Sequence, residues 1–115
     1  MTSPVKKSNY YSGYLAADNF RITSINALAH YTDINEEHVQ YLAIKTGAKE
    51  LKEGPDFKKT GKIEANICIE EWKYRPSLLS NNEYVDPLSL YLCLRNNNDE
   101  SIEMALQQLL KNFKW

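Results

Sequence analysis

The sequence predicts an α+β domain that is mostly helical and carries a small β-hairpin. Three observations lead to this fold class. Residues 25–46 contain two short amphipathic segments separated by a turn, residues 62–70 alternate apolar and polar side chains, and two further helical segments follow Asp86 and Asp99. Helices are therefore expected to supply most of the core, and one strand with a partner is expected to form the hairpin.

Length and composition fit one domain. The chain has 115 residues, of which 43% are hydrophobic and 25% are charged, and this is enough apolar material for one core. Residues 1–9 lack apolar periodicity, so we expect a flexible lead-in there and a single domain over residues 10–115. No stretch approaches the ~20 apolar residues that cross a bilayer, and the first residues do not resemble a signal peptide. The sequence predicts a cytoplasmic protein without membrane contact.

The first helix is expected to begin after Thr23 or Ser24, because either hydroxyl can cap a helix. It is expected to end near residue 32, and its buried face consists of Ile25, Leu28 and Ala29.

A second helix is expected over residues 36–46. Asn35 would cap it, and Glu36 and Glu37 occupy the first turn, where the helix dipole favours negative charge. Gly47 is placed to end it in a left-handed conformation. The side chains that would face inward are Val39, Leu42 and Ala43.

A strand is expected over residues 62–70, because every second residue is apolar. Its partner would be either residues 48–57 or residues 71–75. The alternating apolar positions are Ile63, Ala65, Ile67 and Ile69.

Two helices are expected near the C-terminus. Asp86 followed by Pro87 is a strong helix-start pair, and Asp99 is a second capping residue. The last helix has one apolar face, made of Ile102, Ala105, Leu106, Leu109, Leu110 and Phe113.

The segment LAHYTDINEEHVQYL resembles the helix-turn-helix family. Ala29 stands where the two helices would cross, Ile34 would plug the turn, and Asp33 stands where the family usually has glycine. With a basic turn and a strand after it, this unit resembles a winged-helix arrangement. The resemblance implies a small DNA-binding transcriptional regulator that uses the helix-turn-helix at residues 25–46, with the second helix in the major groove of double-stranded DNA.

The expected DNA-contacting residues come from that second helix and from the basic turn. Net charge gives little support, because 14 basic and 15 acidic residues leave a formal charge of −1. A solvated polar hairpin tip is an alternative interpretation of the lysines. The predicted contacts are Asn35, His38, Gln40, Tyr41, Lys45, Lys58, Lys59 and Lys62.

The tail DPLSLYLCLRNNNDESIEMALQQLL resembles the end of the winged-helix antitoxins of abortive-infection toxin–antitoxin systems. This resemblance implies a bacterial regulator that represses its own operon, with residues 35–41 reading bases. The chain departs from that family, whose members usually carry a further domain.

No catalytic or metal-binding motif is present in the sequence. Cys68 and Cys93 are too far apart to suggest a disulfide framework or a ligand pair, and His30 and His38 lack cysteine or carboxylate partners at zinc spacing. We therefore expect a protein that is not an enzyme and uses no cofactor or metal.

The sequence also suggests a mode of self-assembly and an alternative function. The last helix suggests a homodimer through residues 99–115, with Met104 and Trp115 outside the apolar stripe. The alternative function is a protein–protein interaction adaptor with the same fold and no DNA binding.

Overall fold

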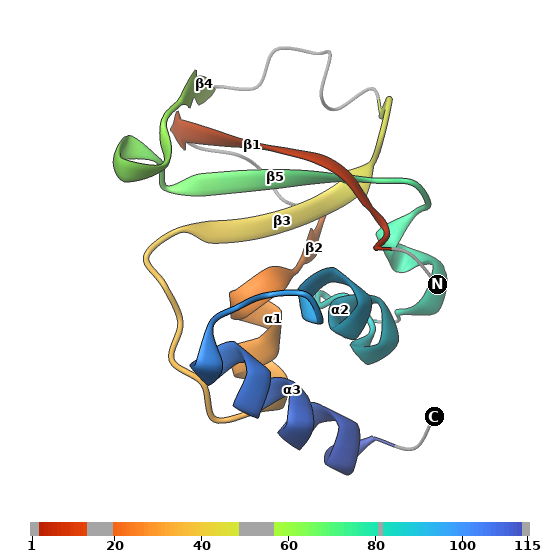
Figure 1. Ribbon diagram of the computed structural model, residues 1–115. Helices are drawn as coiled ribbons and strands as arrows, with labels where there is room; N and C mark the ends of the chain where they lie inside the picture. The colour runs from red at the N-terminus through yellow and green to blue at the C-terminus, as the bar shows by residue number, and fades with distance from the viewer. Residues whose placement is uncertain (1–2, 14–19, 49–56, 81, 114–115) are drawn as a thin grey trace.

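A five-stranded mixed β-sheet forms one layer of the molecule, and three α-helices pack against one of its faces (Figure 1). The arrangement is that of a computed structural model, which describes residues 3–13, 20–48, 57–80 and 82–113. The strand order is β2-β3-β5-β1-β4. The strands are β1 (Val5–Gly13), β2 (Arg21–Ile22), β3 (Gln40–Lys45), β4 (Phe57–Thr60) and β5 (Ile67–Trp72).

Strand β5 lies at the centre of the sheet. It pairs with β3 in parallel and with β1 antiparallel, and the outer strands β4 and β2 pair antiparallel with β1 and β3. The register places Leu42 beside Ile69 and Lys45 beside Trp72. The carboxyl ends of β3 and β5 therefore meet the amino-terminal half of β1 at one end of the sheet.

The predicted fold class is wrong. A mostly helical winged-helix domain with a small hairpin does not contain a five-stranded mixed sheet with a parallel central pair. The expected second helix over residues 36–46 is instead a connection followed by β3. No helix-turn-helix is formed, because only its first helix, α1 (Ser24–Tyr31), is present.

Strand β3 shows why the helix prediction failed. Its four middle residues, Tyr41–Ile44, are all buried, as in a strand that is covered on both faces. The sequence of such a strand does not alternate between apolar and polar residues. A short continuous run of apolar residues cannot be distinguished from a buried helix segment by its spacing. The side chain of Asn26 on α1 fixes the strand, because its Oδ1 accepts a hydrogen bond from the Tyr41 N–H at 2.8 Å.

The expected strand over residues 62–70 and its hairpin also need correction. Residues Lys62–Glu64 form a short 3-10 helix, η2, and β5 begins only at Ile67. Ile63, expected inside, is 95% exposed. The partners of β5 are β1 and β3 rather than residues 48–57 or 71–75. Residues 5–9, expected in the lead-in, belong to β1 and pair with β5.

Both C-terminal helices form where the sequence predicts them. Helix α2 (Pro87–Leu94) begins after Asp86, whose carboxylate accepts a hydrogen bond from the Ser89 N–H. Helix α3 (Glu100–Asn112) begins after Asp99, whose Oδ1 accepts from the N–H groups of Ser101 and Ile102. These caps satisfy amide groups that have no partner inside the helix. A second 3-10 helix, η3 (Pro76–Leu79), precedes α2.

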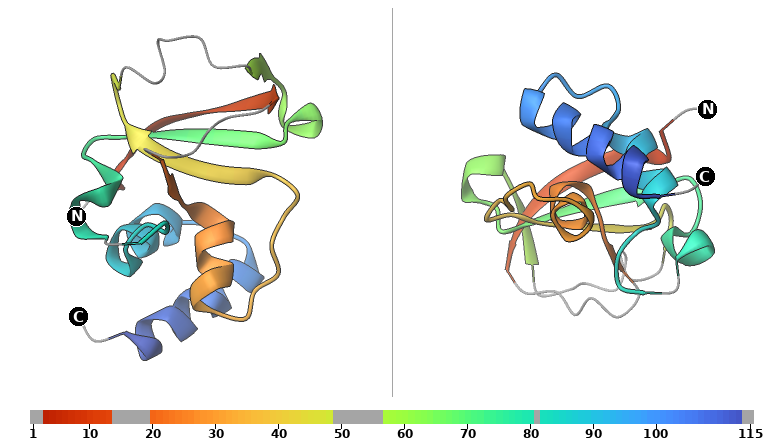
Figure 2. Two further views of the ribbon diagram at one scale, coloured as in Figure 1. Left: turned by 180° about the vertical axis from the view of Figure 1, so that it is seen from behind. Right: turned by 90° about the horizontal axis from the view of Figure 1, so that it is seen from below.

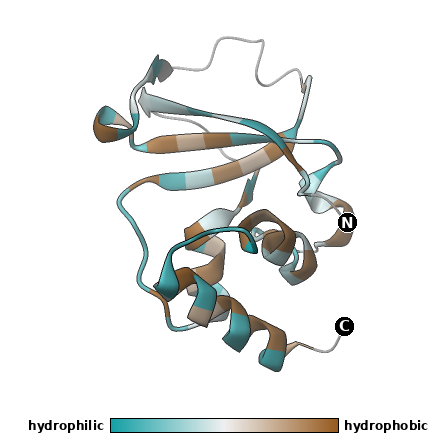
Figure 3. Cartoon of the chain, in the orientation of Figure 1, coloured by the Kyte–Doolittle hydropathy of each residue, from teal (hydrophilic) through white to brown (hydrophobic). Residues whose placement is uncertain are grey.

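Apolar clusters bury both faces of the central strands. On the helix side, Trp72 and Ala43 of the sheet pack with Leu28 of α1, Leu90 of α2 and Leu109 of α3. The opposite face has a second cluster made of Phe20, Leu42, Ile44, Ile67 and Ile69. The other views in Figure 2 show the helices gathered on one side of the sheet, and Figure 3 shows apolar residues along β3 and β5. In the described part of the chain, no helix is long and apolar enough to cross a membrane.

Candidate functional site

The residues predicted to contact DNA are dispersed over the fold. Asn35 and His38 lie exposed in the connection between α1 and β3, Gln40 and Tyr41 begin β3, and Lys45 ends it. The remaining lysines belong to β4 and η2, and they are Lys58, Lys59 and Lys62.

Tyr41, one of the predicted contacts, is buried in the structure. Its side chain packs with Val39 and Cys68, and its hydroxyl donates a hydrogen bond to Glu37 Oε2 at 3.0 Å. Burial, and next the bond to Glu37, raise the pKa of Tyr41 far above its ordinary value. Tyr41 therefore helps to hold β3 in place. The helix that was expected to place Tyr41 in the major groove is not formed.

The predicted basic surface is split between the two ends of the sheet. Gln40 pairs with Ile67, on the side where Lys59 pairs with Tyr11, whereas Lys45 lies beside Trp72 at the opposite end. Lys45 is five positions after Gln40 along the extended strand, which corresponds to about 17 Å. Lys45 and Lys59, which were predicted to contact DNA together, therefore lie at different ends of the sheet.

The sheet topology brings a different set of cations together. Lys45 ends β3 beside Trp72, the Lys73 N–H donates to the Pro4 carbonyl at 2.8 Å, and Lys7 pairs with Glu71. These cations lie at the end of the sheet where β3 and β5 end and β1 begins, and their side chains are all exposed. We call this group the basic end, and it consists of Lys6, Lys7, Lys45, Lys73 and Arg75.

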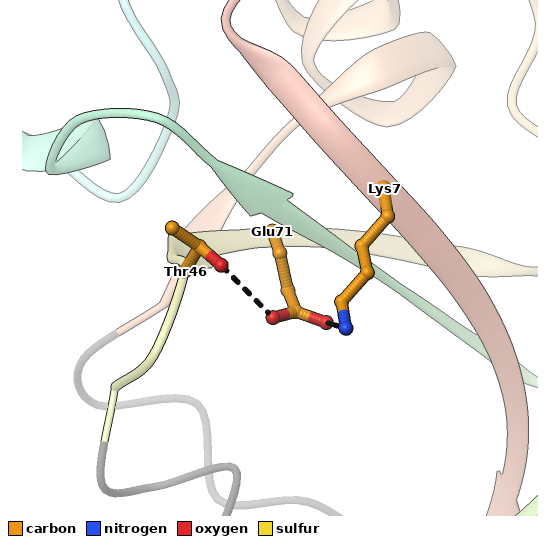
Figure 4. Close-up of polar contacts among 3 residues, drawn as sticks. All are labelled: Lys7, Thr46 and Glu71. Atoms are coloured by element: carbon orange, nitrogen blue, oxygen red, sulfur yellow. Dashed lines mark hydrogen bonds and ion pairs between the residues drawn. The ribbon is translucent and has the colours of Figure 1, made fainter.

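Among the described residues of the basic end, Glu71 supplies an exposed-side carboxylate, and both of its oxygens are engaged. Glu71 Oε2 is 3.5 Å from Lys7 Nζ, and Glu71 Oε1 accepts a hydrogen bond from Thr46 Oγ1 at 3.3 Å (Figure 4). The Lys7 side chain is nevertheless 61% exposed. Within the described part of the chain, the other cations of the basic end form no ion pair. The described residues of this end therefore have a positive excess.

Five exposed acidic side chains lie away from the basic end. Asp33, Glu36 and Glu37 lie in the connection that leads into β3, and Glu100 and Glu103 lie in the first turn of α3. In Figure 1 this connection and the start of α3 are on the left, opposite the end of the sheet that contains Lys45. These acidic side chains lie away from the basic end, although the exposed Lys59 and Lys62 are also at the Gln40 end of the sheet.

Glu70 is the most deeply buried acidic side chain of the described sheet. Its Oε1 accepts hydrogen bonds from Trp72 Nε1 at 3.1 Å and from Thr23 Oγ1 at 3.3 Å. Burial raises the pKa of the Glu70 carboxyl, and these two hydrogen bonds partly oppose that rise. Glu70 therefore links β5 to Thr23, the N-cap residue that precedes α1.

The cysteines are poor nucleophiles. Burial raises the pKa of Cys68 to about 12, and burial likewise raises the pKa of Cys93. A thiol reacts as its thiolate, so both side chains are unreactive near neutral pH. Among the described residues no group of three histidine, cysteine or acidic side chains could hold a metal ion.

Comparisons with known proteins gave no match to a family model, a curated protein or a solved structure. The resemblance of the tail to antitoxins therefore stays an expectation from the sequence.

Sequence reasoning missed most of the basic end. Each of its lysines stands beside or within a segment that becomes a strand, but only the register of β1, β3 and β5 shows that they are neighbours. Two signals were available in the sequence. Lys6 and Lys7 are adjacent, and Lys45 and Lys73 each follow a segment rich in apolar residues.

Proposed function

We infer that this protein is a binding protein whose basic end contacts the phosphate backbone of nucleic acid. The supporting observation is that five exposed cations lie at one end of the sheet, where the carboxylate of Glu71 is already engaged by Lys7 and Thr46. Lysine and arginine that neutralise phosphates supply most of the sequence-independent affinity of DNA-binding proteins.

This proposal replaces the expected mode of binding. Base reading in the major groove needs an element that fits the groove, such as a helix, and residues 40–45 are a central strand. The aromatic side chains beside these cations are engaged in the fold, because Trp72 is fully buried and Tyr74 packs against the core with its hydroxyl hydrogen-bonded to Ser89. Contact through phosphates alone predicts binding that depends strongly on salt and weakly on sequence.

Anisotropy titration of a labelled random-sequence duplex tests the proposal. If three to five phosphates are contacted, the slope of log K against log salt should lie between about −2.7 and −4.5. Two unrelated duplexes should give the same affinity. The absence of binding at ~50 mM salt, or a slope near zero, would contradict the proposal.

A protein–protein adaptor is the second candidate function. Leu78 and Leu79 of η3 are 66% and 57% exposed, and adjacent exposed leucines are suited to contact an apolar partner surface. Binding of this kind would resist salt and would be weakened by Leu78→Ser together with Leu79→Ser. Salt dependence therefore distinguishes the two candidates.

A further inference from the structure

The outer face of α3 has a simple pattern. Glu100, Met104, Gln107 and Lys111 are all exposed, and their spacing of four, three and four residues places them on one stripe of a helix. Met104, near the middle of this stripe, is 67% exposed. In the described part of the chain, neither Glu100 nor Lys111 has an ion-pair partner. The two ends of the stripe thus carry opposite, unpaired charges.

This stripe differs from the surface expected for the homodimer. The apolar stripe that suggested assembly through residues 99–115 packs into the core, where Leu109 is completely buried. A charged substitution at Leu109 would therefore unfold the domain rather than separate two chains. The side that remains available is the outward one, which Figure 1 shows pointing away from the sheet.

The outer stripe is complementary to itself when two copies run antiparallel. Glu100 of each copy then faces Lys111 of the other, and Met104 of each copy faces Gln107 of the other. Two such ion pairs flank two such central contacts, as a two-fold axis requires. A parallel pair would instead place Glu100 against Glu100 and Lys111 against Lys111, which is unfavourable.

We propose that α3 is a homodimerisation helix that pairs antiparallel with α3 of a second copy along Glu100, Met104, Gln107 and Lys111. The charge complementarity selects a second copy of this chain over an unrelated partner. The only large apolar side chain of the stripe is Met104, so the dimer is weak and salt-sensitive. The pairing does not depend on nucleic acid, and it leaves the basic ends of both copies free.

A charge-swap experiment by sedimentation equilibrium tests the proposal on the full chain. Glu100→Lys places lysines opposite each other, and Lys111→Glu places glutamates opposite each other. Each variant should weaken the wild-type dimer by about tenfold, since two attractive pairs become repulsive. An equimolar mixture of the two variants should restore wild-type affinity as a heterodimer, because every facing pair is then again opposite in charge.

The mixture also separates assembly from folding. Glu100→Lys removes a favourable charge from the first turn of α3, but mixing cannot repair a folding defect. The matched controls Glu83→Lys and Lys59→Glu change the net charge equally at exposed positions outside α3, and they should leave the dimer unchanged. A wild-type monomer up to ~1 mM, unaltered association of both variants, or a mixture that stays monomeric would overturn the proposal.

Discussion

Replacing Glu70 by glutamine should change the pH dependence of stability while keeping the local structure. Both hydrogen bonds to this carboxyl end on Oε1, from Trp72 Nε1 and Thr23 Oγ1. The glutamine carbonyl can accept both of them. Glu70→Gln therefore removes the ionisation and keeps the bridge, whereas Glu70→Ala leaves two buried donors unpaired and should cost about 2–6 kcal/mol.

The sign of the pH effect follows from the raised pKa of Glu70. Burial places the folded-state pKa above the ordinary value of 4.5, so the folded chain holds this proton more tightly than the unfolded chain does. The resulting stability is complete below the unfolded-state pKa and is lost as pH rises through the folded-state pKa. Each pKa unit of the rise corresponds to about 1.4 kcal/mol.

Urea unfolding of wild type and Glu70→Gln between about pH 4 and pH 8 measures this effect. The difference in unfolding free energy should move in favour of the variant as pH rises above the unfolded-state pKa, and it should level off above the folded-state pKa. Two parallel stability curves would refute the reasoning, because they would mean that Glu70 titrates equally in the folded and unfolded chains.

Three further outcomes are expected from single features of the fold. Asp99→Ala removes the acceptor of the Ser101 and Ile102 N–H groups and should lower the urea-unfolding free energy by about 1 kcal/mol, whereas a loss near zero would argue against the cap. Leu109→Ala should cost about 2–5 kcal/mol in the same assay, and a much smaller loss would contradict the full burial of this side chain. Because burial raises the pKa of Cys68 to about 12, it should react with a thiol reagent at pH 8 only after denaturation, and rapid labelling of the native protein would contradict that burial.

The sequence predicted those elements whose signals are local. Asp86 with Pro87 and Asp99 act within one helical turn, so they located α2 and α3 without knowledge of the rest of the chain. Strand β1 has no such signal. Its polar residues Lys6, Lys7 and Ser8 are accommodated in a strand because it pairs with β5, about sixty residues later in the chain.

The candidate site depended still more on long-range pairing. The exposed lysines near β4 could be found from their sequence cluster, but the neighbours of Lys45 are determined by its place beside Trp72. The parallel pairing of β3 with β5 requires a long connection between them. If residues 36–46 are interpreted as a helix, this pairing cannot be predicted. The helix interpretation of β3 therefore also determined the expected binding surface, whose residues the structure places at both ends of the sheet.

The central claim is that nucleic acid binds at the basic end rather than at the predicted basic turn. Salt-dependent duplex binding of Lys45→Ala with Lys73→Ala, compared with Lys59→Ala with Lys62→Ala, tests it directly, because both double variants remove two positive charges from exposed positions. The first pair should reduce the magnitude of the salt slope by about 1.8, and the second pair should leave it unchanged. Equal losses in the two variants, or a loss confined to Lys59 and Lys62, would contradict the claim.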